Sequence, residues 1–205
     1  MAYGFEIRNS QGKLLLDSDE TVLMFHSKHK VPASRGGPHT VNLQIKTNEP
    51  PSVFVSGPGV VRLFKTGGSW SMSCYTTIVG GYGPFEVYVF SRPVPTGIYG
   101  LRVFKSNGEL QYQSTSKSLN IIDVVDFNPQ NANAYTPKTY GVKKIAVNSK
   151  LIGFYTVNSI GLYEPAVFLY ASGNRYIPHE FSYGEPPDEL NTEPSSTIVV
   201  DVSRY

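Results

Sequence analysis

Short runs of alternating apolar and polar residues recur along most of the chain, and this period of two limits the fold more than any other feature. The clearest sets are Phe5 and Ile7; Val41, Leu43 and Ile45; Val53 and Val55; Val87 and Val89; Leu101 and Val103; and Val200 and Val202. Such alternation is typical of half-buried strands. Gly-rich turn clusters at 56–59, 67–69 and 106–108 separate the runs. The nearest approach to a helical pattern, 117–127, also reads better as a strand, so the sequence predicts an all-β sandwich or barrel with little helix.

An internal repeat refines this prediction. The segment Tyr3–Leu23 matches Tyr99–Leu119 without a gap and with seven identities. Two shorter matches follow in the same order: Pro51, Val53 and Phe54 with Pro165, Val167 and Phe168, and Val87, Ser91 and Arg92 with Val199, Ser203 and Arg204. We therefore expect two tandem related β-sandwich domains, 1–97 and 98–205, the second with an inserted loop near 126–140. The alternative is chance similarity between short hairpins, which superposition of the two halves would decide.

Charge and cysteine content exclude several classes of protein. The 18 basic and 16 acidic residues give a net charge of +2, too balanced for the basic surface that binds a nucleic-acid backbone. Cys74 is the only cysteine, so we expect a buried thiol, no internal disulfide and folding in a reducing compartment. The first nine residues lack an apolar leader, and no later stretch is long enough for a membrane span; we expect neither export by a leader nor a transmembrane segment.

Catalytic and metal-binding patterns are weak. His26 and His29 lie three residues apart, a spacing that converges on a helix rather than on the expected strand. The acidic residues of 17–20 are too few to hold calcium. Cys74 and His179 stand outside any nucleophile motif. We therefore predict no catalytic residues, no cofactor and no metal, and hence no enzyme.

A cluster of aromatic and polar side chains in the second half is the candidate contact site for a ligand or partner. Its members are Tyr170, Asn174, Arg175, Tyr176, Phe181 and Tyr183. Exposed tyrosine rings stack on sugars or fill pockets of a partner protein. The competing interpretation is that alternate members line the core of the sandwich, because Tyr and Phe are common strand residues.

The opening Tyr3-Gly4-Phe5-Glu6-Ile7-Arg8-Asn9, then Gly12 and Leu14-Leu15-Leu16-Asp17-Ser18, resembles the start of small tail proteins of tailed bacteriophages. A weaker copy spans Tyr99–Ser114, with Gln113 where the first copy has Asp17. The resemblance implies a β-rich virion component of the tail tip, baseplate or tail fibre. Such a component assembles in the cytoplasm of the bacterial host, in several copies, against other tail proteins.

Two rival functions remain open at this stage. One is a receptor- or carbohydrate-binding module at the tail periphery, which would contact a host surface glycan or receptor through the loop 126–140 and the aromatic cluster. The other is a cell-wall-degrading enzyme, which the missing motifs disfavour.

Overall fold

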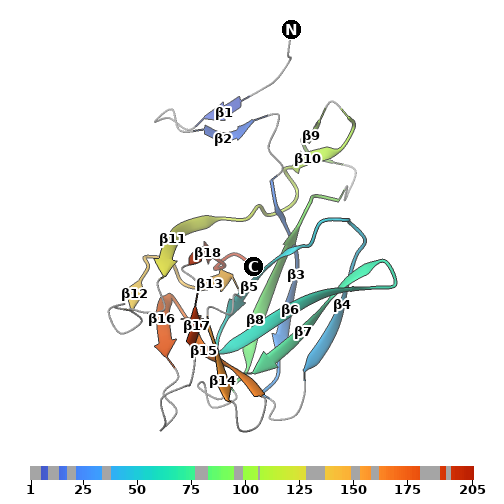
Figure 1. Ribbon diagram of the computed structural model, residues 1–205. Coiled ribbons are helices and arrows are strands. Elements are labelled where there is room, and N and C mark those ends of the chain that lie inside the picture. The colour runs from blue at the N-terminus through green and yellow to red at the C-terminus, as the bar shows by residue number, and fades with distance from the viewer. Residues whose placement is uncertain are drawn as a thin grey trace. The chain divides into compact units, whose positions relative to one another are not determined.

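The computed structural model describes residues 6–8, 14–17, 22–33, 38–76, 83–94, 99–105, 107–127, 137–148, 153–157, 162–180, 190–192 and 195–205 (Figure 1). Every regular element in these ranges is a strand, which confirms the predicted all-β class. The strands of the first half are β1 (Glu6–Arg8), β2 (Leu14–Asp17), β3 (Met24–Val31), β4 (His39–Ile45), β5 (Ser52–Ser56), β6 (Gly59–Thr66), β7 (Ser69–Thr76) and β8 (Phe85–Ser91). Those of the second half are β9 (Arg102–Phe104), β10 (Leu110–Gln113), β11 (Ile121–Phe127), β12 (Lys138–Thr139), β13 (Ile145–Asn148), β14 (Gly153–Val157), β15 (Leu162–Ser172), β16 (Arg175–Glu180), β17 (Leu190–Thr192) and β18 (Ser195–Asp201).

The chain forms two compact units. The smaller unit comprises Met1–His26 with Phe90–Leu119, and the larger unit comprises Ser27–Val89 with Asn120–Tyr205. In the smaller unit, β1 pairs with β2 and β9 pairs with β10, each as an antiparallel hairpin. This division takes residues from both sequence halves into each unit. The predicted boundary between residues 97 and 98 therefore lies within the smaller unit.

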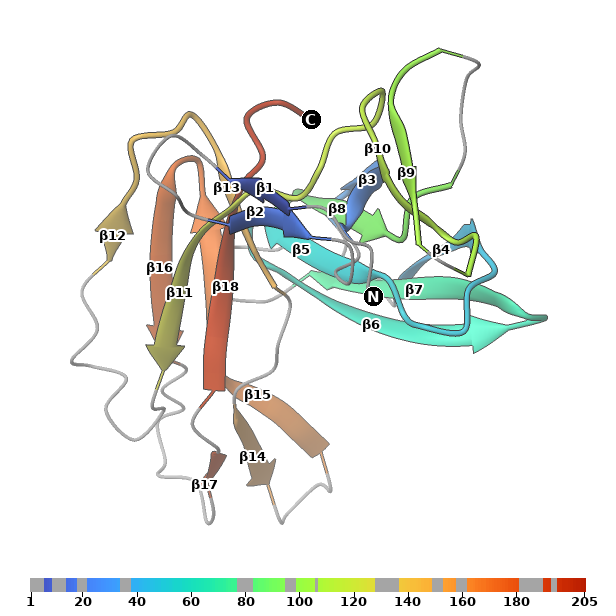
Figure 2. The same ribbon diagram turned by 90° about the horizontal axis from the view of Figure 1, so that it is seen from above.

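Three sheets build the larger unit (Figures 1 and 2). The central sheet has six strands in the order β11-β18-β13-β5-β8-β3. A three-stranded sheet, β4-β7-β6, and a five-stranded sheet, β12-β16-β15-β14-β17, complete the unit. In the middle of the central sheet β5 and β13 pair antiparallel, with Val55 opposite Val147 and Phe54 opposite Asn148. One continuous sheet thus joins strands from the two halves of the sequence.

Two apolar cores lie on one face of the central sheet. In the first core, Val55 and Val87 pack with Met72 of the three-stranded sheet. In the second, Val147 packs with Ala171 and Tyr176 of the five-stranded sheet. Directly opposed residues of an antiparallel pair point to the same face, and Val55 lies opposite Val147. Both smaller sheets therefore cover the same face of the central sheet, in a sandwich-like arrangement.

The opposite face of the central sheet is buried as well. Phe54, Tyr88, Ala146 and Val200 point to that face, and each is at most 2% exposed. The ring of Tyr205 meets the ring of Tyr88 edge-on, with centroids 6.4 Å apart. This corrects the prediction of half-buried strands at 53–55, 87–89 and 200–202: a sheet covered on both faces has apolar residues at consecutive positions, not only at alternate ones.

The two sequence halves contribute strands to the central sheet in the same relative order. From each edge to the centre, the strands are the first, the last and the middle one, in sequence order, of the three that the half contributes. Each half contributes three strands, placed as β3-β8-β5 and as β11-β18-β13. The hairpin match Tyr3–Leu23 and Tyr99–Leu119 falls on β1–β2 and β9–β10, and the last match falls near β8 and β18, which hold equivalent places. The middle match does not fit this scheme, because Val53 lies in the central sheet and Val167 in the five-stranded sheet. The duplication itself stays a prediction, and most of the inserted loop near 126–140 lies outside the described residues.

Candidate ligand site

The hairpin β15–β16 carries the residues that the sequence analysis singled out. Tyr176 is 2% exposed and belongs to the second core, so it is a core residue and not a surface contact. At Tyr176 the competing interpretation, that alternate members of the cluster line the core, is therefore correct, because alternate side chains of β16 point toward the central sheet. On the backbone Tyr170 pairs with Ile177. Phe181 and Tyr183 lie outside the described residues.

Asn174 lies in the turn between β15 and β16, and Arg175 is the first residue of β16. Asn174 is fixed by two bonds to Tyr140: its Nδ2 donates to the Tyr140 carbonyl and its own carbonyl accepts from the Tyr140 amide, both at 3.0 Å. Arg175 is exposed. Of the predicted contact residues with described side chains, Arg175 is thus exposed and Asn174 is half-buried and already bonded.

Cys74 is a buried core thiol, as predicted. It is 1% exposed and packs among apolar residues of the first core. Burial raises the pKa of its thiol to about 12, because the thiolate would lie in an apolar environment. A thiol with this pKa is protonated at neutral pH and is not a nucleophile. Within the described ranges, no three His, Cys, Asp or Glu side chains converge on a metal position.

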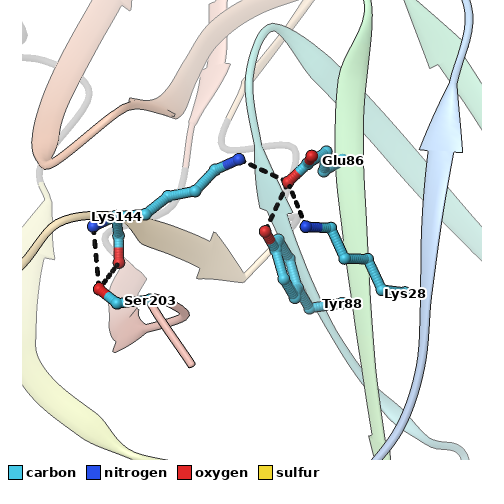
Figure 3. A network of polar contacts seen from close by, with 5 residues as sticks. All are labelled: Lys28, Glu86, Tyr88, Lys144 and Ser203. Atoms are coloured by element: carbon cyan, nitrogen blue, oxygen red, sulfur yellow. Dashed lines mark hydrogen bonds and ion pairs between the residues drawn. The ribbon is translucent and has the colours of Figure 1, made fainter. Parts of the chain in front are cut away.

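A polar network that the sequence did not reveal lies on the face of the central sheet opposite the two apolar cores (Figure 3). Three donors converge on one oxygen, Oε2 of Glu86 on β8. The ammonium of Lys144 lies 2.5 Å from this oxygen, that of Lys28 on β3 lies 3.1 Å from it, and the hydroxyl of Tyr88 donates to it at 2.5 Å. Lys28 also lies over the Tyr88 ring, 5.1 Å from the centroid. No short motif marks this network, because its residues lie up to 116 positions apart in the sequence.

The network fixes the charge state of Glu86. Burial alone would raise the pKa of this carboxyl, but hydrogen bonds from Lys144, Tyr88 and Lys28 outweigh burial and lower the pKa to about 2. Burial and the bond to the Glu86 carboxylate both raise the pKa of the Tyr88 hydroxyl. At neutral pH the carboxylate is therefore charged, the phenol is neutral, and the negative charge is shared between two ammonium groups.

Lys144, the residue directly before β13, is also fixed through its backbone. Its amide donates to Ser203 Oγ at 3.0 Å (Figure 3). Its carbonyl accepts from the amide of Val202 at 3.0 Å. The next residue, Ile145, donates to the carbonyl of Gly173 at 2.8 Å. The lysine is thus held between the C-terminal segment and the β15–β16 turn.

A hollow of about 570 Å³ opens beside this network. Lys30, Lys143, Lys144 and Glu86 are the charged residues that line it, and Pro58 and Pro84 supply part of an apolar wall. Lys30 and Lys143 are exposed, and neither forms an ion pair with a residue that the structure describes. Three ammonium groups against one carboxylate leave the lining with two net positive charges.

Backbone bonds hold the walls of the hollow together. Gly57, at the end of β5, donates its amide to the carbonyl of Ala171 at 2.7 Å. Gly57 has a φ of +115°, and a Cβ there would stand 2.7 Å from Cβ of Phe85, so only glycine fits. Ser172, the last residue of β15, and Gly173 in the following turn also line the hollow. The predicted residues Asn174 and Arg175 follow directly, in the turn and at the start of β16.

A second Lys–acid–Tyr cluster joins β11 to β12. Lys138 donates to Oδ2 of Asp123 at 2.6 Å, and the hydroxyl of Tyr140 donates to the same oxygen at 2.7 Å. The bond from Lys138 lowers the pKa of Asp123, assisted by the bond from Tyr140. Lys138 lies over the Tyr140 ring, 5.3 Å from the centroid. This cluster lines no described hollow, and we interpret it as structural.

Several apolar side chains are exposed on hairpin β9–β10 of the smaller unit and on the segment that leads into it. Tyr99 is 81% exposed, Leu101 59% and Phe104 52%. On the larger unit, Ile121 and Val124 of the edge strand β11 are half exposed. These exposed apolar side chains are the candidate contacts for another protein.

Comparison with known proteins gives no relative: no family model, no curated sequence and no solved structure matches the chain. In the part of the chain that the structure describes, no helix has the length and apolar character needed to cross a membrane.

Proposed function

We propose that this chain is a virion structural protein of a phage tail, associated with the tail tip, baseplate or fibre, and that it acts by assembling with other tail proteins rather than by catalysis. The observation that carries the proposal is the set of exposed apolar side chains on and before hairpin β9–β10: Tyr99, Leu101 and Phe104 are each more than half exposed. Burying such side chains against a partner is the main favourable term in most protein association.

The resemblance of 3–18 to the start of phage tail proteins supports the same function. The hairpin β9–β10 is the second place where that pattern occurs, at 99–114. Gly100 has a φ of +116°, and a Cβ there would stand 2.8 Å from the Thr115 side chain. A Tyr-Gly pair at this position therefore lets the chain turn closely past Thr115 while Tyr99 stays exposed. The recurring pattern and the candidate assembly surface are thus the same segment.

Complementation of a phage that lacks this gene tests the proposal. Purified particles carrying the wild-type chain should contain it by mass spectrometry, with density in the tail by cryo-electron microscopy. The double variant Leu101→Ser with Phe104→Ser removes two exposed apolar side chains and should abolish incorporation while the isolated protein stays folded.

Tyr75→Ser is the matched control, because Tyr75 is also exposed, at 39%, but lies on β7 of the larger unit. Normal incorporation of this control is expected. Absence of the wild-type chain from purified particles would refute a virion role. Normal incorporation of the double variant would remove the hairpin as the assembly surface.

The second candidate function is a receptor- or carbohydrate-binding module at the tail periphery. The lysine-lined hollow favours it, because an open cavity of about 570 Å³ is of the size that ligand pockets commonly have. A glycan array distinguishes the two functions: an assembly protein gives no signal above background, whereas a binding module retains a defined glycan.

A further inference from the structure

We propose that the lysine-lined hollow binds a phosphate dianion carried on a small organic body, with Lys30, Lys143 and Lys144 contacting the phosphate and the wall of Pro58 and Pro84 contacting the body. This inference names a ligand class for the hollow and does not depend on a role in tail assembly. Its first support is the charge of the lining, which carries two net positive charges. A phosphomonoester at neutral pH supplies nearly two negative charges and balances them.

The negative charge of Glu86, the acidic residue in the lining, is already balanced by neighbouring lysines. Glu86 carries one negative charge, and Lys28 and Lys144 both contact its Oε2. The carboxylate cannot also balance Lys30 and Lys143, whose ammonium groups have no ion-pair partner in the described part of the chain. The same contacts leave Lys144 with hydrogen-bonding capacity, since an ammonium has three donors and Glu86 takes one. The lining therefore offers donors from three lysines to an incoming anion.

The type of cation favours phosphate over a single carboxylate. An arginine fork matches the plane of a carboxylate and binds it through two parallel bonds, whereas lysines act as point charges that surround a multiply charged group. The charged side chains of the lining are three lysines and one glutamate, without an arginine. Lysines that bring more than one net positive charge to the lining suit a dianion better than a monoanion.

The frame of the hollow is preorganised. The amide of Gly57 bonds to Ala171, and that of Ile145 bonds to Gly173, so β5, β13 and the β15–β16 turn are tied at the rim. Lys144 is fixed by Glu86 and Ser203. A rigid frame lowers the entropic cost of binding, because fewer groups have to be ordered by the ligand.

Titration calorimetry on the full chain at low salt tests the proposal with three probes: inorganic phosphate, glucose 6-phosphate and glucose 6-sulfate. The two phosphates should bind, and the sulfate ester, which carries one charge, should bind at least about fivefold more weakly. Tighter binding of glucose 6-phosphate than of inorganic phosphate would show that the apolar wall contributes to the affinity by contacting the organic body. Equal binding of the two phosphates would identify the free ion as the ligand and overturn the part of the proposal that concerns the organic body.

Variants locate the site. Lys30→Gln and Lys143→Gln each remove one exposed ammonium group and should weaken binding about fivefold, and the double variant more than either. Lys46→Gln is the matched control, an exposed lysine that does not line the hollow, and should bind as the wild type does. Absence of phosphate binding in the wild type, or equal loss in the control, would overturn the proposal. Because incorporation into particles is not measured here, failure of this test leaves the assembly proposal untouched.

Discussion

Replacing Glu86 with glutamine tests the polar network most directly. The substitution keeps the size of the side chain and removes its charge. Two ammonium groups, those of Lys28 and Lys144, then lie close together without a counter-ion, while both side chains are only about a third exposed or less, at 28% and 34%. We expect the variant to fold, with a lower free energy of unfolding at neutral pH, because the charges attract Glu86 in the native state and repel one another without it.

The size of the effect follows from the lowered pKa. A carboxyl whose pKa falls from 4.5 to about 2 on folding stabilises the native state by roughly 3 kcal/mol at neutral pH when taken at full value. Water still reaches this carboxylate and screens part of the interaction, so we expect about half, ~1.5 kcal/mol. A group with a lowered pKa contributes its full stabilisation above the pKa of the unfolded chain and loses it as the pH falls through the folded value. The difference between wild type and Glu86→Gln should therefore be largest above pH 5 and shrink between 4.5 and 2.

Urea unfolding at pH 7, 5 and 3 measures this difference. Glu109→Gln is the control: Glu109 also forms ion pairs, with Arg92 and Lys105, but its side chain is 42% exposed. Exposed pairs contribute little, so the control should lose less than about 0.5 kcal/mol. A Glu86→Gln penalty that is the same at pH 3 as at pH 7, or that does not exceed the control, would refute the electrostatic reasoning.

Two further predictions concern buried positions. Cys74 should resist thiol-specific reagents at pH 8 in the native state and react fully in urea, because its thiol is buried with a pKa of about 12; rapid native labelling would contradict its place in the core. Gly57→Ala should lower the free energy of unfolding by about 2 kcal/mol or more, since the new Cβ meets Phe85. Gly67→Ala also stands at a positive φ, but in open space, and should cost only about 1 kcal/mol in the same urea titration; equal costs would show that the contact with Phe85 is unimportant.

The fold class could be predicted from the sequence because alternation is a local signal. The strands around Val41–Ile45 and Val87–Val89 form where the pattern placed them, and the burial of Cys74 follows from its position within a strand. The sequence could not show that the central sheet is covered on both faces. Consecutive apolar residues such as Ile145-Ala146-Val147 are consistent with burial on both sides, but nothing local says which segments provide the cover.

Local sequence patterns could not predict the candidate site. Glu86 and Lys144 meet only because β5 and β13 pair in the middle of the central sheet, and that pairing is a long-range contact. Aromatic clustering gave a misleading signal at Tyr176, because alternate residues of one strand face opposite ways and this one faces the core. The prediction was more accurate for the neighbouring Asn174 and Arg175, because they directly follow Ser172 and Gly173, which line the hollow.

A sheet that joins both halves of the sequence has a consequence for unfolding. If the halves were independent sandwiches, each would melt by itself; but Val55 and Val147 lie opposite one another in one sheet, so opening either half exposes the edge and core of the other. Trp70, the single tryptophan, lies on β7 and reports on the first core. Its fluorescence and the far-ultraviolet circular dichroism, which averages over all strands, should therefore change together in one urea transition. A fluorescence midpoint clearly separated from the dichroism midpoint would show that the two halves unfold independently, and that the β5–β13 pairing contributes little to the cooperativity of the larger unit.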